Sequence, residues 1–180
     1  KHAVGPRKEM KIRTVFNLLG PLTNPAGSER QMIGVYDPKL VSKFAMVLKR
    51  LGARRAVVAY GMIGIDEITA VGPTRIAIWD GKVLSEKIMN PEDFGVDLVD
   101  LSEILAGETI EDNAAKMKRA LSDEKSSEAK AVLPGAGVAL WLGDVAKDIQ
   151  EGVIIAKKAI KNGSAIAKLE ELIRRSQTLA

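Results

Sequence analysis

Two adjacent carboxylates, Asp66 and Glu67, stand out because they occur in a short glycine-containing stretch, GMIGIDEIT, at residues 61–69. The stretch follows a continuous apolar run, RAVVAY, which is typical of a buried strand. Ligands of open α/β sheets bind at the carboxyl ends of strands, so the pair stands where a ligand would lie. Neighbouring carboxylates can both reach one Mg²⁺, a hard cation that prefers oxygen ligands. A solvated acidic turn is the alternative, because such pairs are common on protein surfaces.

A second candidate lies in RTVFNLLGPLTNPAG, residues 13–27, which combines a helical pattern with two breaks. The apolar spacing over residues 15–19 indicates a helix, and Gly20 with Pro21 predicts where it ends. A further turn is predicted at residues 24–25. A loop containing Gly20 and Pro21 would let the backbone approach a ligand closely, although the same pair could serve only as a helix stop.

Arg7 is a candidate for binding a carboxylate through two parallel hydrogen bonds. Arg13 follows six residues later, close to two helical turns, so the two side chains would point to related faces if the segment were helical. A solvated arginine is the alternative for Arg7. His2 is the only histidine and stands beside the chain end, so a Ser-His-Asp set is not expected. The chain contains neither a Walker A motif nor a G-x-G-x-x-G pattern.

The elements that would position these residues begin as strand, helix and strand. Residues 31–36 and 55–60 are continuous apolar runs, and residues 39–51 between them repeat apolar side chains at helical spacing. Short links between these segments predict a parallel pair of strands. A hairpin is predicted around Asp80 and Gly81, the strongest short turn signal in the chain.

From Thr109 onward the pattern is helical. The alanine-rich residues 129–142 predict a buried helix despite Pro134 and Gly135, and Asp144 is a candidate cap for the helix that follows. The predicted fold class is therefore α/β, with a mostly parallel sheet flanked by helices and a helical C-terminal half. A fold of this class does not by itself identify a function.

Composition narrows the class of protein. Because the chain has no cysteine, it contains no disulfide and no thiolate metal site, which fits a reducing cytoplasm. No apolar run approaches the roughly 20 residues that a membrane-spanning helix needs, so no membrane partner is expected. The net charge of +4 suits a phosphorylated substrate. Nucleic acid is disfavoured as a partner, since the basic residues form no long block and aromatic residues for stacking are few.

Taken together, these segments resemble one enzyme family. RTVFNLLGPLTNPAG resembles the signature R-T-x-F-N-x-L-G-P-L-x-N-P of anthranilate phosphoribosyltransferases, and VGPRKEMKIRT is similar to the V-x-x-R-x-x-L-G-x-R-T segment before it. GMIGIDEIT resembles the family's G-x-x-G-x-D-E loop, and EGVIIAKKAIKNGSAIAKLEELI is similar to its closing pair of helices. The resemblance covers nearly the whole chain. It implies part of a nucleoside phosphorylase/phosphoribosyltransferase-type domain.

The family transfers phosphoribosyl from phosphoribosyl pyrophosphate to the amine of anthranilate in tryptophan biosynthesis. By position, the resemblance implies that Arg7 contacts the anthranilate carboxylate and that Gly20 and Pro21 line the anthranilate path. Asp66 and Glu67 would hold Mg²⁺ at the diphosphate. It further implies a cytoplasmic protein whose full-length form is a homodimer. Anthranilate's amine is already neutral at pH 7, so no residue is predicted to act as a catalytic base.

The resemblance also predicts a domain assignment. The G-T-G-G-D phosphate loop and the K-H-G-N and H-P-A-M stretches that precede these motifs in the family do not occur in this chain. Residues 1–180 are therefore expected to be the C-terminal part of the large α/β catalytic domain, without the N-terminal helical domain and the phosphate loop. Such a chain is expected to be inactive alone.

This chain departs from the family's pattern at two places, and both departures affect local contacts. Tyr60 stands where the family usually has a histidine, and Pro134-Gly135-Ala136 stands where it often has L-N-A. Two other functions stay open. A nucleoside phosphorylase would use phosphate as nucleophile in the same fold, and a non-catalytic homologue would bind nucleic acid through its basic surface with a steep salt dependence.

Overall fold

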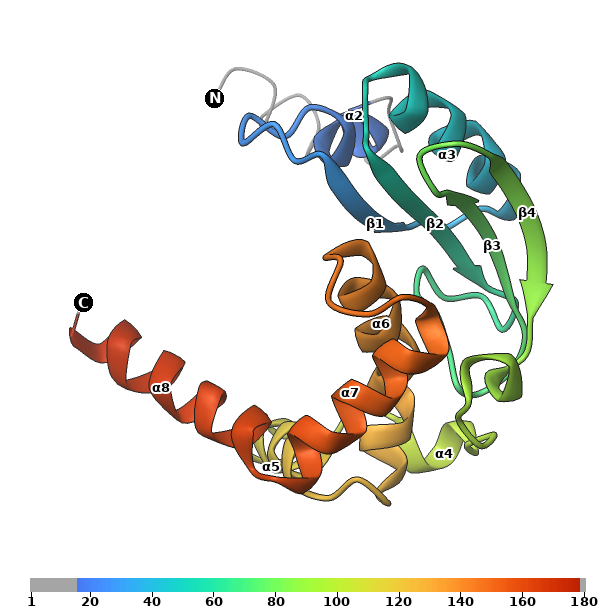
Figure 1. Cartoon of the computed structure of the whole chain (residues 1–180). Helices are drawn as coiled ribbons and strands as arrows, with labels where there is room; N and C mark the ends of the chain where they lie inside the picture. Colours follow the sequence, from blue (N-terminus) through green and yellow to red (C-terminus); the bar gives the residue numbers. More distant parts are fainter. Residues whose placement is uncertain (1–15, 179–180) are drawn as a thin grey trace, which may run out of the picture.

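The computed structural model describes residues 16–178 and places a four-stranded sheet beside a group of helices (Figure 1). The strands are β1 (Arg30–Gly34), β2 (Arg55–Gly61), β3 (Thr74–Trp79) and β4 (Leu84–Met89). The α-helices are α2 (Phe16–Leu22), α3 (Val41–Arg50), α4 (Leu101–Ile104), α5 (Ile110–Ser122), α6 (Ser127–Leu142), α7 (Ile149–Lys161) and α8 (Ser164–Thr178). Two short 3-10 helices, η1 (Pro38–Leu40) and η2 (Pro91–Phe94), complete the described part of the chain.

The sheet has the order β1-β2-β3-β4. β1 and β2 run parallel with α3 as their crossover, which confirms the predicted strand-helix-strand unit. β3 and β4 form the predicted hairpin, and both β2–β3 and β3–β4 are antiparallel. The α/β class is confirmed, but the sheet is mixed and not mostly parallel. A hairpin necessarily reverses direction, and β3 pairs directly with β2, so one of the three pairings is parallel.

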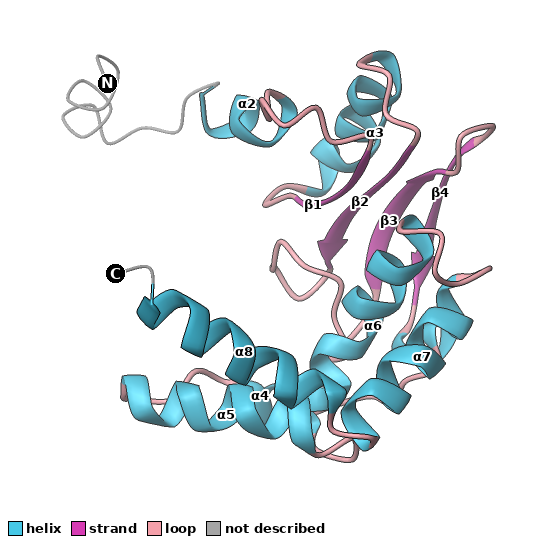
Figure 2. Ribbon diagram, turned by 60° about the vertical axis from the view of Figure 1, so that its left-hand side comes forward, coloured by secondary structure: helices cyan, strands magenta, loops and turns pink. Residues whose placement is uncertain are grey.

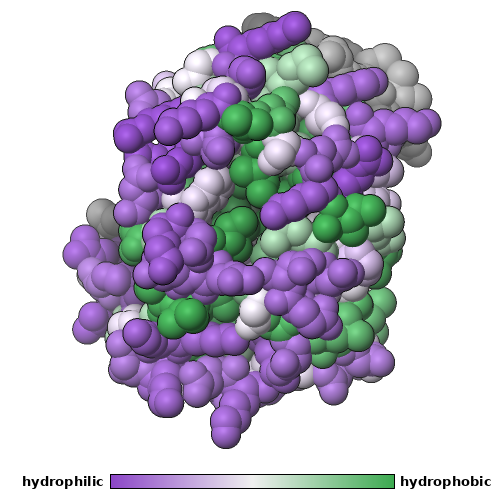
Figure 3. All heavy atoms as spheres, turned by 45° about the vertical axis from the view of Figure 1, so that its right-hand side comes forward, coloured by the Kyte–Doolittle hydropathy of each residue, from purple (hydrophilic) through white to green (hydrophobic). Residues whose placement is uncertain are grey.

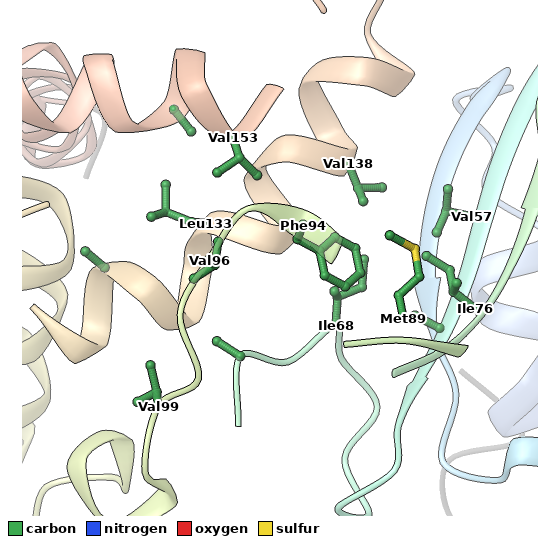
Figure 4. Close-up of a cluster of buried hydrophobic side chains, with 14 of the residues drawn as sticks. Val57, Ile68, Ile76, Met89, Phe94, Val96, Val99, Leu133, Val138 and Val153 are labelled. Carbon is green, nitrogen blue, oxygen red and sulfur yellow. The ribbon is translucent and has the colours of Figure 1, made fainter. Parts of the chain in front are cut away.

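Both faces of β2 are buried, which explains why its residues from Ala56 to Ala59 are all apolar. In β2, Val57 and Ala59 join the cluster that faces α6 and α7, whereas Ala56 and Val58 join the cluster that faces α3. Successive side chains of a strand point to opposite faces, so an uninterrupted apolar run is needed to fill two cores. Figure 4 shows the first cluster, where Phe94 lies between the strand residues and the helical side chains.

The helical C-terminal half is confirmed, and Figures 1 and 2 both place α5, α7 and α8 on the side of the molecule away from α3. α6 lies between the sheet and α7 and contacts both. α6 and α7 cross closely where two glycines meet. A Cβ atom added at Gly137 would lie 2.5 Å from Val153 Cγ2, and one added at Gly152 would lie 2.3 Å from the carbonyl oxygen of Gly137.

Two local predictions are wrong. α2 does not end at Gly20 but continues through Pro21 to Leu22. A proline in a helix removes only its own N–H, and in so short a helix this leaves a single carbonyl without its usual donor. Asp144 does not cap α7, because Asp148 does so with a carboxylate that accepts from the N–H of Glu151 at 2.8 Å.

The surface mixes polar and apolar residues. On the face seen in Figure 3, hydrophobic residues are exposed in patches between hydrophilic ones. Within residues 16–178, no helix is both long enough and apolar enough to cross a membrane.

Candidate metal and ligand site at the carboxyl edge of the parallel strands

The acidic loop is built directly on the end of β2. The N–H of Gly61 donates to the carbonyl of Ile65 at 2.8 Å, and the N–H of Gly64 donates to the carbonyl of Gly61 at 2.8 Å. These bonds close a tight turn that presents Asp66 and Glu67 immediately after it. Downstream, the N–H of Thr69 donates to the hydroxyl oxygen of Thr74 at 3.1 Å, and both threonines are buried. The carboxylate pair is therefore fixed by backbone bonds on one side and by a buried hydroxyl on the other.

A glycine in the neighbouring strand brings this loop against the sheet. A Cβ atom added at Gly34, the last residue of β1, would lie 1.5 Å from the carbonyl oxygen of Asp66. No side chain fits in that space, so the backbone of the acidic loop packs directly on the backbone of β1. Glycine inside an apolar strand is a signal of such close approach. The sequence shows this signal in QMIGVY, residues 31–36, although Gly34 is not among the predicted site residues.

A cavity of about 390 Å³ opens beside the carboxylates. Three elements and the acidic loop form its walls, with contributions from β1, β2 and α6. The lining residues are Met32, Ile33, Gly34, Ala59, Asp66, Glu67, Ile68, Ala131, Val132, Gly135 and Ala136. The volume lies in the range of roughly 300–1,000 Å³ that is usual for small-molecule sites. The cavity lies at the carboxyl end of the parallel pair, where α/β sheets bind ligands.

The charged side chains of this cavity wall are both acidic. Asp66 and Glu67 are exposed, and within residues 16–178 neither carboxylate makes a hydrogen bond or ion pair. The cavity wall contains no lysine, arginine or histidine. In the described part of the chain, no cluster of three or more acidic, histidine or cysteine side chains could hold a metal ion. Two free carboxylates suit Mg²⁺ bound jointly with a phosphorylated ligand, because Mg²⁺ is commonly held by one or two carboxylates plus substrate phosphates.

The other predicted site residues are not part of this cavity. Gly20 and Pro21 lie exposed on α2, outside the cavity wall. Arg7 lies outside the described residues. The structure thus brings Asp66 and Glu67 together with Gly34 and Gly135, and it does not bring Gly20 and Pro21 to them.

The fold and the site together define an α/β domain whose acidic ligand cavity lies at the carboxyl edge of a parallel strand pair. The chain belongs to the glycosyl transferase family, a/b domain, which matches residues 1–166. It is 44% identical over 173 residues to an anthranilate phosphoribosyltransferase of Moorella thermoacetica, covering 96% of this chain and 51% of that protein. It is 46% identical over 173 residues to an enzyme of the same name from Geobacter sulfurreducens, covering 96% of this chain and 49% of that protein.

Solved structures show the same likeness. The crystal structure of anthranilate phosphoribosyltransferase from Thermus thermophilus superposes with a TM-score of 0.83 at 37% identity, covering 94% of this chain and 50% of that one. The enzyme from Saccharomyces cerevisiae in complex with PRPP and Mg gives a TM-score of 0.81 at 26% identity, covering 98% of this chain and 51% of that one. The chain therefore spans about half the length of the relatives it matches.

Proposed function

We propose that this chain carries the magnesium-binding part of an anthranilate phosphoribosyltransferase, which transfers phosphoribosyl from phosphoribosyl pyrophosphate to anthranilate in tryptophan biosynthesis. The observation that carries the proposal is the free Asp66–Glu67 pair at the mouth of the cavity. It is supported by the similarity to the Saccharomyces cerevisiae enzyme solved with PRPP and Mg and by the relatives named anthranilate phosphoribosyltransferase.

In this proposal Asp66 and Glu67 hold Mg²⁺ through oxygen atoms, which matches both the charge and the ligand preference of the ion. Bound Mg²⁺ would offset the negative charge of the leaving diphosphate. Gly34 lets the loop lie against β1, so the two carboxylates are held before a ligand arrives.

Arg7, Gly20 and Pro21 have proposed roles in binding anthranilate, and these roles rest on the family resemblance. Arg7 would bind the carboxylate of anthranilate with two parallel hydrogen bonds and so turn the amine toward C1 of the ribose. Gly20 and Pro21 would form a wall beside the aromatic ring. In a polypeptide that also contains the part of the relatives that this chain does not span, we expect Arg7→Gln to raise the KM for anthranilate much more than the KM for phosphoribosyl pyrophosphate. Equal effects on both substrates would contradict the role of Arg7.

The cavity wall holds no cationic side chain, so groups beyond this wall must neutralise most of a diphosphate. We propose that the part of the relatives that this chain does not span supplies those groups, and that the chain alone does not turn over. We also propose that a polypeptide containing both parts is a cytoplasmic homodimer. Phosphoribosyl transfer by the pure 180-residue chain would contradict the first of these proposals, and a monomeric mass in light scattering would contradict the dimer.

The decisive experiment measures Mg²⁺ binding by calorimetry for the chain and for Asp66→Asn and Glu67→Gln. Each substitution keeps the shape of the side chain and removes its charge, so we expect Mg²⁺ affinity to fall at least tenfold. Glu108→Gln is the matched control, because Glu108 is exposed and makes no hydrogen bond or ion pair within residues 16–178. Unchanged Mg²⁺ affinity in Asp66→Asn and Glu67→Gln would rule out the proposed metal site.

A further inference from the structure

A second cavity, of about 520 Å³, lies on the face of the sheet that packs against α3. The strand register places Tyr60 of β2, Arg75 of β3 and Ile88 of β4 opposite one another. Directly opposite residues of antiparallel strands point to the same face, so these three side chains form a row. Tyr60 packs against the cluster that faces α3, which fixes the face. The lining residues are Pro38, Tyr60, Met62, Arg75, Glu86, Lys87 and Ile88, and none of them lines the cavity beside the acidic pair.

The lining of this second cavity is largely apolar and open to solvent. Met62 is 50% exposed and Ile88 is 57% exposed, and Pro38 and Tyr60 are half-buried beside them. Exposed apolar side chains that gather around one cavity indicate a binding surface, whereas scattered ones need no explanation. The hydroxyl of Tyr60 makes no hydrogen bond within residues 16–178. Tyr60 also stands where the family usually has a histidine, so this lining is not the family's usual one.

Arg75 is the cationic side chain of the row. Its Nε donates to Glu86 Oε1 at 2.5 Å, and within residues 16–178 its two terminal nitrogens take part in no other hydrogen bond. Its side chain is 41% exposed, so these nitrogens can reach a ligand. Lys87 lies opposite Ile76, whose side chain belongs to the cluster on the other face of the sheet, so Lys87 points away from the row. A guanidinium with free terminal nitrogens binds a carboxylate through two parallel hydrogen bonds.

We propose that the second cavity binds a small planar aromatic carboxylate, with its carboxylate on Arg75 and its ring against Tyr60 and Met62. A ring suits this lining because aromatic side chains and methionine sulfur both make favourable contacts with aromatic rings. One guanidinium beside Glu86 suits a single negative charge and not a diphosphate. The site does not depend on the proposed function, because it lies on the opposite face of the sheet from the acidic cavity. In Figure 1 the row runs from β2 through β3 to β4, the last strand of the sheet.

The test titrates the whole chain with benzoate and follows the backbone amide chemical shifts by NMR. We expect saturable shifts centred on Tyr60, Met62 and Arg75, and much weaker binding of benzamide, which keeps the ring and lacks the charge. Arg75→Gln should weaken benzoate binding at least tenfold, and Tyr60→Leu should weaken it to a smaller extent. Glu86→Gln should tighten it, because the substitution removes a repelling charge and frees Arg75. A gain in affinity cannot result from loss of folding.

Arg119→Gln is the matched control. Arg119 is also an exposed arginine paired with one glutamate, Glu128 at 2.7 Å, and it lies on α5 outside the second cavity. It should bind benzoate as the unaltered chain does. Absence of saturable shifts at Tyr60 and Arg75 would overturn the proposal, as would equal affinity of Arg75→Gln and Arg119→Gln. Shifts confined to Gly20 and its neighbours would place benzoate where anthranilate is proposed to bind, which overturns the second site and leaves the proposed function standing.

Discussion

Gly34 and Asp66 meet through their backbones, and this contact gives the clearest prediction for a single residue. In Gly34→Ala the new methyl group would overlap the carbonyl of Asp66, so the acidic loop must move away from β1. Overpacking of this kind costs about 1–3 kcal/mol of folding free energy. We expect that loss in urea unfolding, together with a fall in Mg²⁺ affinity of at least tenfold in calorimetry.

Gly72→Ala is the control for that experiment. An added Cβ atom at Gly72 would meet Ile63 Cγ2 at 3.4 Å, an ordinary contact, and Gly72 lies in the segment that follows the acidic loop. It should bind Mg²⁺ normally. A Gly34→Ala chain that also bound Mg²⁺ normally would show that the position of the loop does not depend on β1.

At the same scale, the sequence allowed some site residues to be predicted and others not. Asp66 and Glu67 could be predicted as site residues because a carboxylate pair that follows a buried strand has a defined place in an α/β sheet. The role of Gly34 depends on which loop lies against it, and that contact joins residues far apart in the chain. The roles of Arg7, Gly20 and Pro21 come from the family resemblance and stay predictions.

At the scale of elements, Asp144 shows why the predicted cap was wrong. The spacing near the start of a helix suits a cap, but the partners of Asp144 come from two distant strands. Asp144 forms ion pairs with Arg30 of β1 and with Arg55 of β2, the latter at 2.7 Å. Arg55 also donates to the carbonyl of Trp141 at 2.9 Å. Together these contacts tie the end of α6 to the starts of both parallel strands.

We predict that Asp144→Ala lowers the free energy of unfolding by about 1–2 kcal/mol, between the values for exposed and buried ion pairs. Asp144 also has a φ of 60°, which is costly for any residue except glycine. Asp144→Gly removes the same carboxylate without that strain, so it should be more stable than Asp144→Ala. Equal stability of Asp144→Ala and the unaltered chain would show that the ion pairs contribute nothing.

The crossing of α6 and α7 gives a second prediction at this scale. Gly137→Ala would place a methyl group against Val153 and the backbone of α7, so we expect it to destabilise the chain by about 1–3 kcal/mol. Gly135→Ala, in the same helix, should instead stabilise it by about 0.5–1 kcal/mol, because alanine fits the helix better and meets no neighbour. Urea unfolding of both variants measures directly whether each substitution raises or lowers the free energy of unfolding. The same sign for both would contradict this account of the crossing.

For the whole molecule, sequence patterns correctly predicted the α/β class and the helical C-terminal half. They wrongly predicted that most strand pairings in the sheet are parallel. Apolar runs and turn signals fix where strands and helices lie, because these depend on neighbouring residues. Strand pairing depends on contacts between distant segments. The hairpin around Asp80 and Gly81 was visible in the sequence, but its attachment beside β2 was not, and that attachment makes the sheet mixed.

The two buried clusters share the strand β2, and this predicts how the molecule unfolds. Val57 contributes to the cluster with α6 and α7, and its neighbour Val58 contributes to the cluster with α3. Neither cluster can lose its strand while the other remains intact, so the sheet and the helical half should unfold as one cooperative unit. The chain offers a direct test, since one of its two tryptophans packs against each cluster: Trp141 against the first and Trp79 against the second.

We predict that Trp79→Phe and Trp141→Phe, each retaining one tryptophan as a fluorescent probe, show urea transitions that coincide with the loss of helical circular dichroism in the same variant. Leu133→Ala, which empties a fully buried site on α6, should cost about 2–5 kcal/mol and shift the transitions of both probes together. If Leu133→Ala shifted the Trp141 transition and left that of Trp79 in place, the helical half would unfold independently. The cavity between α6 and the sheet would then join two separately stable parts, and ligand binding would be expected to stabilise their contact.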